Sequence, residues 1–95
     1  MEIIQHNEER KGDFTAIEDG KQAGIMTYTW AGPHKFIIDH TEADPAFKGQ
    51  GVGMQLLHQA VAYAREHDLK ILPLCPYAKA MFERHSEIRD VLFST

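Results

Sequence analysis

Three glycines at alternate positions, Gly49, Gly51 and Gly53, are the feature of this 95-residue chain with the clearest chemical consequence. Glycine has no side chain, so backbone N–H groups beside it can approach a ligand closely. An amphipathic stretch with helical spacing follows directly, and its first turn would add unpaired N–H donors and the positive end of a helix dipole. The pattern therefore predicts an anion site suited to phosphate or pyrophosphate.

The charges around this loop support an anion site. Between Phe47 and Arg65 there is no acidic residue, although 14 Asp and Glu outnumber 10 Lys and Arg in the whole chain. Helices ordinarily collect acidic residues in their first turn, and a carboxylate here would compete with a bound phosphate. A tight turn before an ordinary helix is the alternative, because short glycine motifs also occur without a ligand.

Two common phosphate motifs do not fit the spacing. A P-loop requires Gly-Lys followed by Ser or Thr, and no such triplet occurs in the sequence. The dinucleotide pattern G-x-G-x-x-G fails because Met54 stands where its third glycine would lie. The phosphate-bearing ligand must therefore be recognised by another kind of loop.

The loop resembles the acetyl-CoA loop of the GNAT superfamily of N-acetyltransferases, R/Q-x-x-G-x-G/A, usually preceded by Val-x-Pro. Here the pattern is Lys48-Gly49-Gln50-Gly51-Val52-Gly53, preceded by Ala43-Asp44-Pro45. Lys48 replaces the usual Arg or Gln, and Ala43 replaces the usual Val. The pyrophosphate is held mainly by backbone amides, and Lys still supplies positive charge. Both departures are therefore compatible with CoA binding.

The resemblance extends to a short branch of GNAT-like proteins that are little more than the CoA-binding core and carry Cys-Pro-Tyr-Ala after the helix. The matching segments are residues 39–42, the glycine loop and residues 74–82, and they span roughly residues 36 to 85. Three motifs in the same order are more specific than one. The resemblance implies an acetyl-CoA-dependent N-acetyltransferase, with acetyl-CoA as cosubstrate and no metal. It implies CoA contacts from Thr41, Ala43, Lys48, Gly49, Gln50, Gly51, Val52, Gly53, Pro76, Tyr77 and Lys79.

Local patterns predict strands first, followed by a helix, a strand and a second helix. Strands at 14–18 and 24–30 would be joined through Asp19-Gly20, a strong hairpin signal. The remaining expected elements are a strand at Lys35–Ala43, a helix after the glycine loop, a strand at 71–75, a helix from Pro76 to about Glu83 and a last strand at 91–93. The first helix has an apolar stripe with a 3.6-residue period, formed by Leu56, Leu57, Ala60, Val61 and Ala64.

The GNAT resemblance implies how these elements assemble. It implies a minimal GNAT-like fold of the α/β (α+β) class, with a mixed, mostly antiparallel sheet and two main helices. In that fold the strand before the glycine loop and the strand after the helix splay apart, and the pantetheine arm of CoA lies between them. Pro73 lacks an N–H, so we expect it to help keep this gap open; the alternative is a proline at an ordinary strand end.

Cys75 is the first catalytic candidate. It stands just before Pro76, at the start of the predicted second helix, whose dipole can stabilise a thiolate. A thiolate beside a thioester could accept the acetyl group, and a thiol could protonate the departing CoA sulfur. A small buried hydrophobic residue is the competing interpretation of a lone cysteine at a strand end.

His40 is the second candidate, as a base that takes a proton from the incoming amine; a half-exposed strand histidine without a catalytic role is the competing interpretation. Alternation places it with Phe36, Ile38 and Glu42 on one face of the strand, and Glu42 is a rival base. A bulge in this strand would change which side chains point inward. Many GNAT enzymes carry a tyrosine that protonates the leaving thiolate, at a position that corresponds here to Phe82. Cys75 or a water would have to take that part.

Composition sets the remaining expectations. With 43% hydrophobic and 25% charged residues, residues 1–95 should form a single globular GNAT-like domain. The net charge of −4 argues against non-specific nucleic-acid binding, and no stretch is long and apolar enough to cross a membrane. One cysteine allows no internal disulfide, and the N-terminus lacks the features of a signal peptide. We therefore expect a cytoplasmic protein, a monomer or weak dimer, without a metal-ligand spacing among its histidines.

The acceptor side is expected to be open. Only residues 18–22 separate Ile17 from Ala23, so the helices that most GNAT enzymes insert between their first two strands cannot be present. An open site suits a lysine or N-terminal amine on a protein, or a small polyamine held by the acidic balance of the chain. The alternative is a non-catalytic acetyl-CoA-binding module, acting as a sensor or a subunit.

Overall fold

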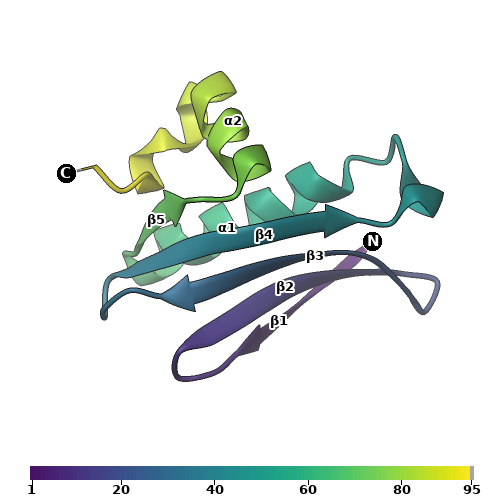
Figure 1. The fold of residues 1–95 in the computed structure, drawn as a ribbon, viewed down its shortest axis with the longest axis horizontal. Coiled ribbons are helices and arrows are strands. Elements are labelled where there is room, and N and C mark those ends of the chain that lie inside the picture. The colour runs from purple at the N-terminus through teal and green to yellow at the C-terminus, as the bar shows by residue number, and fades with distance from the viewer. Residues whose placement is uncertain (95) are drawn as a thin grey trace.

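Five strands form a single sheet in which the spatial order follows the chain order, β1-β2-β3-β4-β5. The computed structural model describes residues 1–94. The strands are β1 (Glu2–Asn7), β2 (Lys11–Glu18), β3 (Lys21–Trp30), β4 (Lys35–Ala43) and β5 (Lys70–Pro73). Neighbouring strands are antiparallel except β4 and β5, which are parallel (Figure 1).

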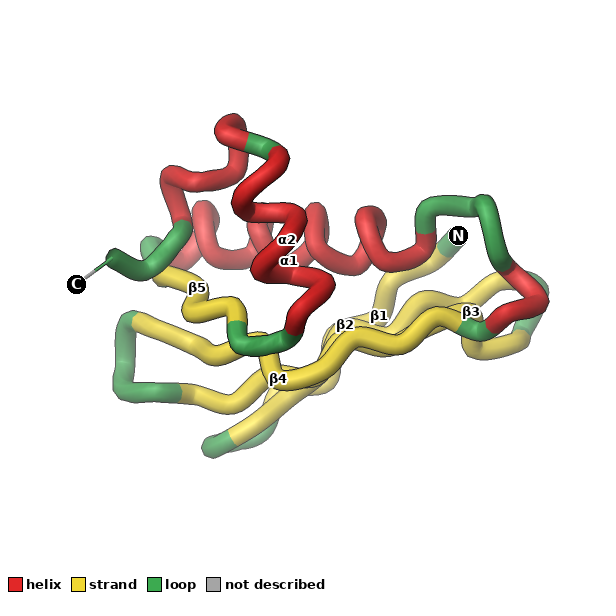
Figure 2. The backbone as a smooth tube through the Cα atoms, turned by 45° about the horizontal axis from the view of Figure 1, so that its top comes forward, coloured by secondary structure: helices red, strands yellow, loops and turns green. Residues whose placement is uncertain are grey.

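Helices connect and follow the last two strands. A 3₁₀ turn η1 (Pro45–Phe47) and the long helix α1 (Val52–His67) lead from β4 to β5, and α2 (Pro76–Arg84) and the 3₁₀ segment η2 (Ser86–Val91) follow β5. Figure 2 shows both α-helices on one side of the sheet. A mixed, mostly antiparallel sheet with two main helices confirms the predicted fold class.

The core lies between the sheet and α1. The predicted stripe of α1 is buried as expected, together with Val52. It packs on the inward side chains of the three central strands, among them Phe14, Met26, Tyr28, Phe36 and Ile38. The buried Tyr28 hydroxyl accepts a hydrogen bond from Gln5 Nε2 and donates one to Asn7 Oδ1, so its polar group is satisfied inside the core.

The N-terminal strands form a meander built on a two-residue turn. Asp19 and Gly20 have φ values of 51° and 76°, the left-handed conformation that a tight hairpin turn requires. The predicted hairpin is confirmed. β1 was not predicted, because its sequence Glu-Ile-Ile-Gln-His-Asn does not alternate cleanly and it becomes a strand through its pairing with β2.

A bulge in β4 changes the predicted facing of its side chains. Thr27 pairs with His40 while the next residue, Tyr28, pairs with Ile38, so Asp39 is the extra residue. Beyond the bulge the alternation is reversed. Thr41 therefore lies on the helix side with Phe36 and Ile38, and the prediction that His40 and Glu42 share that face is wrong.

The strand predicted at 91–93 is wrong for Val91, which ends the 3₁₀ segment η2, but Leu92 is extended and the N–H of Phe93 donates to Ile71 O on β5. After η2, Leu92 makes an isolated bridge to Ile71. Two arginines hold the turn: Arg89 donates to Phe82 O and Glu83 O at the end of α2, and Arg65 donates to Asp90. These contacts hold Ser86–Val91 in its tight helical turn.

Candidate functional site

The strands β4 and β5 separate after four paired residues. Their pairing ends at Ile38 and Pro73. The N–H groups of Leu74 and Cys75 both donate to Ile38 O, at 3.1 Å each, and the chain then enters α2. β4 continues to Ala43, and among residues 1–94 no strand pairs with its last five residues on this side. A gap therefore opens between β4 and the start of α2.

Backbone groups of β4 face this gap. The N–H of Asp44 donates to Ala23 O on β3, at 2.8 Å. Because successive residues of a strand direct their N–H and C=O groups to opposite sides, those of Thr41 and Ala43 point away from β3. The end of β4 thus presents a strand edge that an extended amide-containing ligand can pair with.

The expected role of Pro73 needs correction. The N–H groups of Lys70 and Leu74 donate to His34 O and Ile38 O on the β4 side. By alternation, position 73 points away from β4, so its missing N–H weakens the outer edge of β5 and not the pairing with β4. The gap opens because Leu74 and Cys75 share one acceptor and α2 begins at Pro76.

Cys75 lies at the base of the gap and is buried, with 2% of its surface exposed. It caps α2: its Sγ accepts from the N–H of Ala78 at 3.3 Å. The Thr41 hydroxyl lies 3.2 Å from the same sulfur. The helix N-terminus and a hydroxyl thus fix the position of the thiol, an arrangement that suits either a packed N-cap or a nucleophile.

His40 and Glu42 lie on the other face of β4. Both side chains are exposed, and His40 Nε2 is 3.4 Å from Glu42 Oε1, so the carboxylate can orient the imidazole. The strand itself separates this pair from Cys75. The structure therefore does not bring the three predicted catalytic residues together on one face, and a substrate would have to pass through the gap to meet both groups.

The glycine loop owes its shape to two different requirements. Gly49 and Gly51 have φ values of 85° and 67°, which side-chain-bearing residues rarely adopt. Gly53 instead lies under the ring of Tyr77, where a Cβ atom would be 2.8 Å from Cζ. The first two glycines set the backbone of the loop, and the third lets α2 pack against the first turn of α1.

The N-terminus of α1 is open to an anion. Gly51 is its N-cap, and within the described chain no side chain caps this end and no acidic residue lies in the first turn. The first N–H groups of a helix have no intrahelical acceptor. Lys48 and Gln50 are exposed beside them. Three of the predicted CoA contacts, Val52, Gly53 and Lys48, therefore border one cluster of donors and positive charge.

The first turn of α2 borders the gap from the other side. Pro76 and Lys79 are exposed, and Tyr77 is half-buried against Gly53. Burial raises the pKa of Tyr77, and the neighbouring Cys75 adds to the rise. Phe82, expected from the sequence at the position of the usual tyrosine, is 2% exposed in the core.

Acidic groups, among them Glu8 and Asp39 from the predicted acidic balance, line a hollow on the open face of the sheet, opposite the helices. The hollow has a volume of about 370 Å³, and its lining includes the acids Glu8, Asp13 and Asp39, one base, Lys11, and the hydroxyl residues Thr27 and Thr29. Thr29 donates to Asp39 at 2.6 Å, and Thr15 donates to Asp13 at the same distance. Thr27 pairs with His40, so the hollow adjoins the candidate base. Asp13 escaped prediction because its nearness to Asp39 depends on the strand register.

Within residues 1–94 no helix is long and apolar enough to cross a membrane. Nor do the described residues contain a group of three or more His, Cys, Asp or Glu side chains placed to hold a metal ion.

Comparison with known proteins identifies the class to which this fold and gap belong. A family model described as GCN5-related N-acetyl-transferase matches residues 13–91, and the chain belongs to that family. A GCN5-like protein from Staphylococcus aureus, solved by NMR, is 32% identical, with a TM-score of 0.71 over 97% of this chain and 89% of its own.

More distant matches include one curated sequence and one solved structure. Protein NATD1 from Xenopus tropicalis is 26% identical over 74 residues, which are 78% of this chain and 68% of NATD1. The aminoglycoside N-acetyltransferase AAC(6')-Iy, solved with CoA, is 14% identical and has a TM-score of 0.59 over 93% of this chain and 71% of its own. At that identity the likeness concerns the fold alone.

Proposed function

We propose that the chain binds acetyl-CoA in the gap between β4 and α2 and transfers the acetyl group to an amine. One observation carries the proposal: an open strand edge at Thr41 and Ala43 leads to the uncapped N-terminus of α1. Pantetheine is an extended diamide and would pair with the strand edge. The pyrophosphate would meet the helix N-terminus.

Individual roles follow from this pose. Gly49, Gly51, Val52 and Gly53 would supply backbone N–H groups to the pyrophosphate, and Lys48 would add positive charge. The N–H of Gln50 already donates to Phe47 O, so Gln50 would contribute through its exposed side chain. On α2, Pro76 and Tyr77 would flank the pantetheine arm, with the exposed Lys79 nearby. The sequence Cys75-Pro76-Tyr77-Ala78 supports membership of the short GNAT-like branch.

The thioester would lie at the base of the gap, next to Cys75. The thiol, held by the Ala78 N–H and the Thr41 hydroxyl, would take the acetyl group or protonate the CoA sulfur. His40, oriented by Glu42, would accept the proton of an amine that approaches from the open face. The acidic hollow beside His40 favours a cationic acceptor, either a protein amine or a small polyamine.

A non-catalytic acetyl-CoA-binding module is the second candidate. Two observations favour it: Phe82 lacks the hydroxyl that would serve the leaving thiolate, and β4 separates His40 from Cys75. Release of free CoA distinguishes the candidates. A transferase should release CoA faster when a polyamine or a lysine peptide is added, whereas a binding module should show the same slow release with and without an amine.

Acetyl-CoA binding itself is tested at Gly51 by calorimetry. Asp and Asn have nearly the same shape, both tolerate the left-handed conformation, and a Cβ at this position meets no atom within 4 Å of the described structure. Gly51→Asp should weaken acetyl-CoA binding at least tenfold more than Gly51→Asn, about 1.4 kcal/mol, because only Asp brings a negative charge to the pyrophosphate. Equal affinities in the two folded variants would contradict the proposed site.

A further inference from the structure

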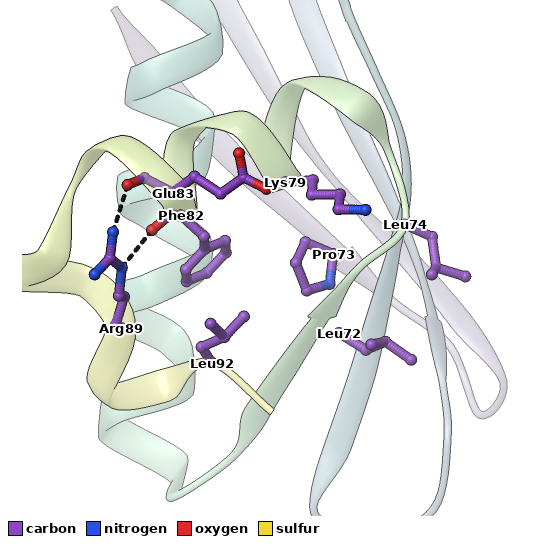
Figure 3. Close-up of a pocket in the computed structure, with 8 residues that line it drawn as sticks. All are labelled: Leu72, Pro73, Leu74, Lys79, Phe82, Glu83, Arg89 and Leu92. Atoms are coloured by element: carbon purple, nitrogen blue, oxygen red, sulfur yellow. Dashed lines mark hydrogen bonds between the residues drawn. The ribbon is translucent and has the colours of Figure 1, made fainter. Parts of the chain in front are cut away.

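The two edges of the sheet differ in how far they are protected from further pairing. β5 forms one edge, and the N–H of Phe93 donates to Ile71 O on its outer side. The missing N–H of Pro73 also lies on that side. Figure 3 shows Pro73 beside a cavity of about 530 Å³ that Phe82 of α2 and Leu92 line as well. The outer edge of β5 is therefore partly covered and poorly suited to another strand.

β1 forms the other edge and has none of these protections. Its register with β2 is regular over Glu2–Asn7, and the strand contains no Pro or Lys. In the strand order of residues 1–94, β2 is its one partner, and Figure 1 shows β1 at the border of the sheet. Ile4, a large apolar residue, keeps 39% of its surface exposed. This edge is available to a further strand.

Hydrogen bonds already in place decide which backbone groups of β1 face outward. The N–H of Glu8, directly after the strand, donates to Lys11 O on β2. Because the direction alternates along a strand, the even-numbered residues of β1 direct their N–H and C=O groups toward β2. The odd-numbered residues, among them Ile3 and Gln5, direct theirs outward. A further strand must therefore bond with the odd-numbered residues.

A second copy of β1 meets this requirement when it runs antiparallel about a two-fold axis at Ile4. Ile3 then lies opposite Gln5 of the second copy, and the two residues are placed to exchange both backbone hydrogen bonds. Ile4 lies opposite Ile4 on the axis, and Glu2 lies opposite His6 on either side of it. These side-chain pairs are of the non-hydrogen-bonded kind, in which side chains approach most closely, and opposite charges there stabilise the pairing.

The neighbouring registers are less favourable. The outward groups stay matched only if the axis moves by a whole residue. An axis at Gln5 places Glu2 opposite Glu8, two like charges that oppose pairing. An axis at Ile3 places Glu2 opposite the apolar Ile4. The axis at Ile4 is the one of the three that combines an apolar pair with pairs of opposite charge.

The side chains that would meet are exposed on the face of the sheet away from the helices. Glu2, Ile4 and His6 alternate with Ile3, which packs against the core. His6 Nδ1 lies 3.0 Å from Asp13 Oδ1 on the neighbouring strand. When it is protonated, His6 would bridge this aspartate and Glu2 of the second copy.

We propose that two copies of this chain associate through β1, antiparallel about a two-fold axis at Ile4, so that one sheet runs through both. The contact is small, so the dimer is weak and depends on concentration. β1 and β5 are opposite edges of the sheet, so the gap beside β4 stays accessible in both copies. The inference is therefore independent of CoA binding.

The first test measures the mass of the full chain in solution at about pH 6, where histidine side chains carry more of their positive charge. In sedimentation velocity, the mass should rise from that of a monomer toward twice that value as the concentration is raised to about 1 mM. A mass that stays monomeric up to this concentration would overturn the inference. That result is also expected if the edge pairs with an extended peptide of another protein.

An exchange of charges tests the register. His6→Glu places a carboxylate opposite Glu2 on both sides of the axis and should raise the dissociation constant by about fivefold or more. Adding Glu2→Lys to the same chain restores opposite charges and should bring the constant back to within about twofold of the unmodified protein. Positions 2 and 6 lie about 13 Å apart within one strand, so such a rescue arises between copies. His58→Glu makes the same change on the exposed side of α1 and should leave the constant unaltered.

Failure of the double variant to associate again would overturn the register and the inference with it. Ile4→Lys supplies a further test, because two like charges would then meet on the axis. Ile4 is exposed, so this variant should fold, and it should be monomeric at concentrations where the unmodified chain is a dimer. A folded Ile4→Lys protein that dimerises as before would place the interface elsewhere and refute the proposal.

Discussion

Gly24 on β3 gives a quantitative test of the packing beneath the glycine loop. A Cβ atom at this position would be 2.6 Å from Val52 Cγ1 and 2.7 Å from Glu42 O. Val52 is the first residue of α1 and is buried, and Glu42 belongs to the strand paired with β3. The substitution Gly24→Ala therefore forces apart the helix start and the end of β4, which together border the gap.

The expected cost can be worked out from these contacts. Overpacking a core costs about 1–3 kcal/mol, and the upper end applies because a backbone carbonyl cannot rotate away as a side chain does. Replacing Gly by Ala in a strand returns about 0.5–1 kcal/mol. The net loss in free energy of unfolding should be about 2 kcal/mol, and Tm should fall by roughly 8–16 °C for a domain of this size.

Urea denaturation followed by the fluorescence of Trp30, the single tryptophan, measures this loss. Gly53→Ala is the matched control, because its Cβ would meet the far end of the Tyr77 ring at 2.8 Å. That ring is half-buried and can swing outward, and Ala gains about 1 kcal/mol over Gly within a helix. The change should stay within about 1 kcal/mol. A Gly24→Ala protein as stable as the unmodified one would refute the reasoning.

Two further predictions concern the thiol and the acid stability. Incubation with acetyl-CoA and no amine should leave an acetyl thioester on Cys75. Mass spectrometry of the intact protein should show the added acetyl mass, and hydroxylamine should remove it. Full turnover by Cys75→Ser would assign the thiol to packing. The ion pair with Arg65 lowers the pKa of Asp90, so this contact stabilises the fold above the ordinary Asp pKa and its contribution is lost as pH falls through the lowered value. Arg65→Ala should therefore reduce the loss of stability measured by urea titrations between about pH 5 and pH 2, and an unchanged acid profile would contradict the role of this pair.

Local sequence signals predicted much of this fold. The Asp19-Gly20 turn was predictable because its two residues tolerate positive φ at low cost. The stripe of α1 was predictable because its 3.6-residue period continues over three turns. The anion loop was predictable from Gly49 and Gly51, whose conformations other residues rarely adopt, and from the lack of acidic residues after them. Each of these signals is contained in a short segment.

Features that depend on pairing between strands were not predictable. The bulge at Asp39 follows from how β4 aligns with β3, and this one extra residue decides that Thr41, and not His40, faces Cys75. The direction of Pro73 depends on which side of β5 carries the partner strand. The nearness of Asp13 to Asp39 likewise needs the register of three strands. No local period encodes such alignments.

The agreement between strand order and chain order has a consequence for how the molecule folds. β2, β3 and β4 each pair with the strand just before them, through short turns, so most sheet contacts are close in sequence and should form quickly. Only the pairing of β4 with β5 must wait for closure of a loop that contains η1 and α1. The gap is thus assembled from the contacts that form last, and local unfolding in the mature protein should begin where the ligand is expected to bind.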